Sequence, residues 1–209
     1  MITEAVREHE PVLIAWDAPL SFHRGDFYDR PIDYAAWSWL RTQEVEGAAA
    51  APFANLPHWA VTCHTLGLPF GRRPSKLRLA PADLRRETRS GAFVIEVHPS
   101  LTLAIWSIEA QVALEPRRGR GRNACPQIVD LLRESLANPP ALDWDYDLLD
   151  AYVAWRVAEL FLDGGARWIG DPTNGAYVLP AGGAADNIEV EYEEALQEWE
   201  RGNVLRRRP

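Results

Sequence analysis

Two short apolar runs predict buried β-strands. Residues Pro11–Trp16 (PVLIAW) are continuously apolar and end at Asp17, and Phe93–Val97 (FVIEV) is interrupted only by Glu96. Near-continuous apolar runs of this length are typical of parallel strands that are buried on both faces. A proline follows each run within a few residues and ends it. The two runs therefore predict a parallel sheet in an α/β protein.

Apolar residues at helical spacing predict helices around these strands. The clearest helix is expected at Tyr146–Leu162, where one apolar stripe runs until Gly164 and Gly165. Short apolar segments on either side of the turn 171–175 predict a β-hairpin. Further helices are expected at 33–47, 56–66, 81–89, 101–112, 128–136 and 188–201. With no internal repeat and no linker, these elements predict a single domain over residues 1–209.

The composition is that of a globular protein. The 209 residues are 47% hydrophobic and 25% charged, which excludes a disordered, collagen-like or disulfide-based protein. No apolar stretch approaches the roughly 18 residues of a membrane span, and the first residues carry acids where a signal peptide needs an apolar region. We therefore expect a cytoplasmic protein with no membrane contact.

The charge is unevenly distributed along the chain. The formal net charge is −8, which argues against a protein that coats nucleic acid with its whole surface. Residues 72–122 nevertheless hold 11 of the 22 basic residues and five acids, so this segment carries +6 and the remainder −14. All basic residues except Lys76 are arginine, which suits bidentate phosphate contacts, although genome composition explains this bias equally well. A local site for a polyanion is compatible with this pattern.

Two acids lie at the predicted carboxyl ends of strands. Side chains alternate along a strand, so Asp17 shares a face with Leu13 and Ala15, and Glu96 shares a face with Val94. Ligands of open parallel sheets bind beyond the carboxyl ends of the strands, which makes both acids candidate site residues. The equally weighted alternative is that each acid only caps the turn or helix that follows it.

A further pair of acids lies on the strongest predicted helix. Asp147 and Asp150 are three residues apart and share a helix face that Ala151 and Ala154 continue. Two acids gathered near a packed surface suit a bound cation. Taken alone, a favourable interaction with the positive end of the helix dipole is the better explanation, and it accounts for Asp147 better than for Asp150.

Taken together, four segments resemble a known family. The segments are Ile14–Leu20 (IAWDAPL), Val94–Pro99 (VIEVHP), Asp147–Ala151 (DLLDA) and Ile169–Pro180. In this order they are similar to motifs of the bacterial and archaeal proteins called domain of unknown function 429, which are predicted ribonuclease H-like nucleases. The resemblance extends from about residue 11 to residue 180, and an acidic helix with a basic tail follows at 186–209.

The resemblance implies a fold, an activity and a set of site residues. The fold would be a ribonuclease H-like mixed sheet flanked by helices. Catalytic Asp17, Glu96 and Asp150 would converge and, with Asp147, hold Mg²⁺ or Mn²⁺ for phosphodiester cleavage. From the charge distribution we also expect the basic segments 72–89 and 117–122 to flank this acidic site. The candidate substrate contacts are Arg24, Arg30, His98, Arg117, Arg118 and Arg120.

Simpler explanations exist for the substrate contacts. Ordinary solvated loop charge is the favoured explanation for any single arginine. His98 could act as a proton shuttle or metal neighbour, but a histidine that is hydrogen-bonded at the end of a strand is more common. The nine tryptophans invite a base-stacking interpretation, yet packing is the better account for most of those in predicted elements, and none is assigned to substrate. The tryptophans in predicted elements are Trp37, Trp39, Trp106, Trp155 and Trp168.

One departure from the family pattern changes the functional expectation. Ribonuclease H-like folds begin with antiparallel strands that carry a central metal-binding aspartate, whereas eleven residues precede Val12 here. Either the recorded start is too late or the fold is N-terminally shortened, and a shortened sheet would expose an edge that a homo-oligomer could cover. The alternatives to a nuclease are therefore a catalytically inactive binding module for nucleic acid or protein, and a metal-dependent hydrolase of a small phosphorylated metabolite.

Overall fold

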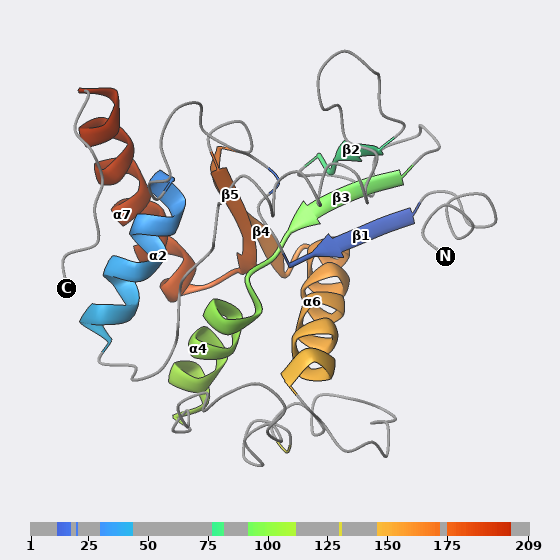
Figure 1. Cartoon of the computed structure of the whole chain (residues 1–209). Helices are drawn as coiled ribbons and strands as arrows, with labels where there is room; N and C mark the ends of the chain where they lie inside the picture. The colour runs from blue at the N-terminus through green and yellow to red at the C-terminus, as the bar shows by residue number, and fades with distance from the viewer. Residues whose placement is uncertain are drawn as a thin grey trace.

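The computed structural model describes residues 12–17, 20, 30–43, 77–81, 92–111, 130, 146–171 and 175–201. The described elements are, in chain order, β1 (Val12–Trp16), α2 (Pro31–Thr42), β2 (Leu77–Leu79), β3 (Ala92–Glu96), α4 (Pro99–Ala110), α6 (Tyr146–Asp163), β4 (Ala166–Asp171), β5 (Gly175–Pro180) and α7 (Gly183–Glu200). Figure 1 shows these helices and strands intermixed in one α/β arrangement. The predicted α/β class is confirmed. No helix in the described ranges combines the length and apolar character needed to span a membrane.

The strands form two small sheets. Strands β1, β3 and β2 form a parallel sheet in that order, and Trp16 is the register partner of Glu96. Strands β4 and β5 form an antiparallel hairpin, in which Asp171 pairs with Gly175. Strand β3 is therefore central, and all five of its residues are buried. Within the described part of the chain, β1 lies at one edge of the parallel sheet.

Most predicted elements appear close to their expected positions. Strands β1 and β3, helix α6 and the β4–β5 hairpin match the apolar patterns that predicted them. Helix α2 begins at Pro31 and ends at Thr42, before the expected stop at Gly47, and α7 begins at Gly183, before the expected Ile188. Strand β2 was not predicted, because its three residues are too few for a periodic pattern. The helices expected at 56–66, 81–89 and 128–136 lie outside the described residues apart from Pro81 and Asp130.

The two faces of the parallel sheet bury different side chains. On one face, Leu13 and Ile95 belong to the apolar core that the sheet shares with α6. On the other face, Ile14 and Trp16 pack with Val94 and with Leu20. This division follows from the alternation of side chains along each strand and from the register of β1 with β3.

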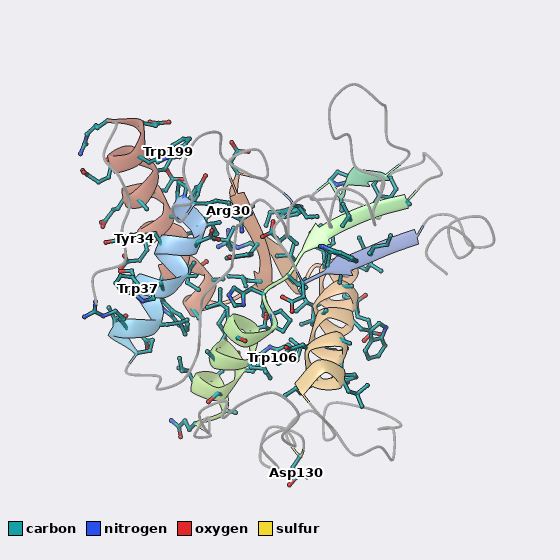
Figure 2. All side chains as sticks on the ribbon, viewed as in Figure 1. Arg30, Tyr34, Trp37, Trp106, Asp130 and Trp199 are labelled. Carbon is teal, nitrogen blue, oxygen red and sulfur yellow. The ribbon has the colours of Figure 1, made fainter. Side chains whose placement is uncertain are left out.

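A second core lies away from α6. It joins α2, α4, β5 and α7, and α2 and α7 run side by side next to β5 (Figure 1). Trp39 is buried in this core, and the half-buried Trp106 packs against both cores from its position between α4 and α6 (Figure 2). The half-buried Trp168 packs against the first core. These contacts agree with a packing role for the three tryptophans.

Candidate functional site

A pocket of about 430 Å³ lies between β1 and α6. The strand side contributes Leu13, Ala15 and Asp17, and the helix side contributes Asp150, Ala151, Ala154, Trp155 and Ala158. We call this site the β1–α6 pocket. Its volume falls in the range of roughly 300–1,000 Å³ that is common for small-molecule sites.

Local periodicity explains why these residues meet. Strand residues two apart share a face, so Leu13, Ala15 and Asp17 all point toward α6. Helix residues four apart share a face, which aligns Asp150 with Ala154 and Ala158. The alanines are small enough to leave space between the strand and the helix. Asp17 is exposed and Asp150 is half-buried, so two carboxylates from distant parts of the chain line one pocket that is open to solvent.

Glu96 does not line this pocket. Its register partner is Trp16, and both side chains lie on the face of the sheet opposite to Asp17. Glu96 is 2% exposed, and its carboxylate accepts a hydrogen bond of 2.6 Å from the backbone N–H of Leu20. This bond ties Leu20 to the end of β3. The structure thus brings Asp17 and Asp150 together and gives Glu96 a different environment.

Glu96 belongs to a buried ion-pair cluster with Arg30, Asp33 and Tyr177. Arg30 is the N-cap residue of α2, lies beside β5 (Figure 2) and donates to both Glu96 oxygens, at 3.1 and 2.6 Å. It also donates to both oxygens of Asp33, at 3.0 and 2.8 Å. The Tyr177 hydroxyl donates to Asp33 at 2.5 Å. The cluster therefore joins the beginning of α2 to the end of β3 and to the middle of β5.

Burial and ion pairing act in opposite directions on the charged groups of this cluster. Burial raises the pKa of the Glu96 carboxyl above its ordinary value, and the nearby Arg30 opposes this shift. Burial also acts to lower the pKa of Arg30, but Asp33 and Glu96 outweigh it and raise that pKa well above its ordinary value. Arg30 is 2% exposed and turns its guanidinium toward buried carboxylates. Arg30 is therefore a buried cation with a structural role in the fold, because solvent does not reach it.

His98 has a capping position at the start of α4. Its Nδ1 accepts a hydrogen bond of 3.4 Å from the backbone N–H of Leu101, and its ring packs edge-on against Tyr177 with centroids 5.3 Å apart. The side chain is buried, and it does not line the β1–α6 pocket. His98 is therefore a hydrogen-bonded histidine near the end of a strand, which is the simpler of the two interpretations given above.

The remaining predicted site residues are not described. Asp147 lies in α6 one turn before Asp150, but its side chain is outside the described part of the structure. Arg24, Arg117, Arg118 and Arg120 also lie outside the described residues. Among the described side chains, no group of three His, Cys, Asp or Glu residues is arranged to hold a metal ion. The carboxylates that the pocket does offer are those of Asp17 and Asp150.

Sequence reasoning missed Trp155 as a pocket residue. Packing is the better account for most of the five tryptophans in predicted elements, but Trp155 is 46% exposed and lines the β1–α6 pocket. Its ring lies against Tyr152, with centroids 5.3 Å apart and an interplanar angle of 45°. One available signal was its spacing: Trp155 follows Ala151 by four residues and therefore continues the helix face that starts at Asp150.

Comparison with known proteins gives one match. The family model described as "Protein of unknown function (DUF429)" matches residues 1–174. No curated protein and no solved structure matches the chain.

Proposed function

We propose that this chain, which belongs to the DUF429 family because the family model covers most of its length, is a metal-dependent phosphodiester hydrolase of the nuclease type with a ribonuclease H-like fold. The observation that carries the proposal is that Asp17 and Asp150 line one solvent-open pocket, one from the carboxyl end of β1 and one from α6. Both acids belong to the motifs through which the sequence resembles this family of predicted nucleases.

The donor set of the pocket fits a hard divalent cation. Mg²⁺ is usually held by one or two carboxylates, with waters and substrate phosphate oxygens completing its shell. Asp17 and Asp150 would hold Mg²⁺ or Mn²⁺ here, and Asp147, one helical turn away, is the candidate for a further ligand. When bound, such an ion polarises a phosphoryl oxygen and lowers the pKa of a coordinated water.

The chain itself supplies position and charge. Asp17 directly follows β1, and Leu20, three residues later, is hydrogen-bonded to Glu96 at the end of β3. Asp150 lies on α6, which packs in the core. Sites built on packed strands and helices hold their geometry more precisely than sites on loops. Without a cation, the two carboxylates repel both each other and a phosphate, so cation binding must accompany substrate binding.

The arginines supply a second, longer-range contribution. Residues 72–122 carry a net +6, and Arg117, Arg118 and Arg120 are in this segment. We propose that these arginines contact the phosphate backbone of a nucleic acid, which would draw a polyanion toward an acidic pocket. Neutralising the three arginines should weaken nucleic-acid binding and make its dependence on salt concentration less steep.

The test of the metal site compares three substitutions. Asp17→Asn and Asp150→Asn keep the side-chain shape and remove the charge, while Asp163→Asn removes a charge from the same helix outside the pocket. Mn²⁺ binding, measured by titration calorimetry, should weaken at least about tenfold in the first two variants and stay unchanged in the third. Hydrolysis of a single-stranded oligonucleotide should fall on the order of 100-fold in the same two variants.

Other outcomes would favour other functions. Hydrolysis of small phosphate esters without cleavage of oligonucleotides would favour the metabolite hydrolase. Nucleic-acid binding with no Mn²⁺ binding and no hydrolysis would contradict the enzyme proposal and leave the inactive binding module.

A further inference from the structure

Trp155 is placed unusually for a tryptophan in a packed helix. Among the described residues, Trp155 and Val190 are the exposed large hydrophobic side chains. Other apolar residues of α6, including Val153, Val157 and Phe161, are buried in the core. Only part of the indole of Trp155 is removed from water, and it borders the pocket that contains Asp17 and Asp150. An exposed aromatic ring beside polar groups in a concave site is a typical ligand contact.

The surroundings of Trp155 hold the ring and leave room beside it. Tyr152 packs against the indole at 5.3 Å between centroids, which restricts its orientation before any ligand arrives. Ala151, Ala154 and Ala158 line the same pocket with side chains that occupy little space. A flat group can therefore enter without displacing a large side chain, and a restricted ring loses little freedom when it binds one.

We propose that Trp155 is a stacking platform for an unpaired nucleobase, so that the substrate of this site is a single-stranded nucleic acid. This inference rests on the proposed function, because the neighbouring carboxylates and their cation would take the phosphate to which the base is linked. Every base has a flat π-face, so stacking on indole tolerates any sequence. Bases inside a duplex are stacked on each other and present no free face, which favours single strands over duplexes.

The test measures binding rather than cleavage. Fluorescence anisotropy would compare a labelled single-stranded oligonucleotide, the same strand with abasic residues, and a duplex, each in EDTA and in Mn²⁺. Trp155→Ala should weaken binding of the normal single strand about 5- to 150-fold, and Trp155→Phe should weaken it less because an aromatic face remains. Binding of the abasic strand should stay the same in both variants. Val190→Ala is the matched control, since it removes an exposed apolar side chain from α7.

Several results would overturn the stacking role. Equal weakening for normal and abasic strands would show that Trp155 acts without touching the base, and unchanged binding in Trp155→Ala would remove it from the site. A site for an organic cation, held by the ring and the two carboxylates, would also overturn it. That site would show tetramethylammonium binding that Trp155→Ala weakens, with no effect on oligonucleotides. Circular dichroism melting of each variant identifies any loss that comes from unfolding.

The stacking role and the proposed hydrolase fail in different ways. If Asp17→Asn abolishes Mn²⁺ binding and cleavage while Trp155→Ala changes no binding constant, the stacking role is wrong and the hydrolase stands. If the wild-type chain binds no Mn²⁺ and cleaves nothing, but Trp155→Ala selectively weakens binding of the normal strand, the hydrolase is wrong. The stacking role then survives as part of a single-strand binding module.

Discussion

Arg30 donates to both carboxylate oxygens of Glu96, which lies 66 residues further along the chain, at 3.1 and 2.6 Å. Both side chains are buried, and Asp33 gives the same guanidinium a second carboxylate. A buried ion pair often contributes little more than apolar residues of the same shape would contribute. Removing only one partner is different, because a charge is then left buried without compensation.

Arg30→Met should therefore destabilise the protein strongly. The substitution leaves Asp33 and Glu96 in an apolar environment without their cation, and we expect the free energy of unfolding to fall by about 3–5 kcal/mol. Urea denaturation at pH 7 measures this change. Arg156→Met is the matched control, because Arg156 pairs with Glu159 where both side chains are about one-third exposed. Its loss should stay below about 1 kcal/mol, and similar losses in the two variants would contradict the structural role of the cluster.

Tyr177 should make the protein sensitive to alkaline pH. Burial and the neighbouring Asp33 carboxylate raise the pKa of Tyr177 well above its ordinary value of 10.0. Above pH 10 the unfolded chain loses this proton while the folded chain keeps it, so stability falls as the pH rises toward the folded-state pKa. The slope is at most about 1.4 kcal/mol per pH unit for one proton.

Tyr177→Phe removes this proton and provides the comparison. Urea denaturation from pH 8 to 11 should give parallel stability curves for the wild type and the variant below about pH 10, and a shallower decline for the variant above it. Curves that stay parallel through the whole range would show that Tyr177 titrates as it does in the unfolded chain.

Gly175 should resist substitution because of both its backbone and its surroundings. Its φ of +114° is unfavourable for other residues, and a Cβ atom there would lie 2.9 Å from Arg30 Cδ and 3.0 Å from Ile32 Cγ2. We expect Gly175→Ala to cost at least about 1–3 kcal/mol in thermal denaturation. Gly183→Ala, at the start of α7 with no atom within 4 Å of the added Cβ, should be neutral or slightly stabilising. An equal cost at both glycines would contradict the close approach of Gly175 to Arg30.

Mn²⁺ should stabilise the wild type more than it stabilises Asp17→Asn or Asp150→Asn, because both residues line the pocket that would hold the ion. With Mn²⁺ at about 100 times its dissociation constant, the wild type should gain about 2.7 kcal/mol and the variants much less. Thermal denaturation with and without Mn²⁺ measures this gain, and the same Mn²⁺ shift in all three proteins would place the cation elsewhere.

The sequence by itself determined the local elements and which residues within each element share a face. The apolar runs located β1 and β3, and the periodic apolar stripe located α6. These patterns are visible in the sequence because each one is formed by residues that are close together along the chain. The alternation that groups Leu13 with Asp17 and the helical spacing that groups Asp150 with Ala154 are also local. These two groups form the β1–α6 pocket.

Only the tertiary structure decided which residues share an environment across the chain. The register that pairs Trp16 with Glu96 puts Asp17 and Glu96 on opposite faces of the sheet, and a strand's own alternation cannot reveal the register of its neighbour. Arg30 has the local sequence pattern of an ordinary loop arginine, yet it forms an ion pair with Glu96 on β3 and is buried. Helical spacing puts Trp155 on the same side of α6 as Ala151, but only the packing of β1 against α6 makes that side the wall of a pocket. In each case, contacts between elements distant in sequence set the burial that gives the side chain its role.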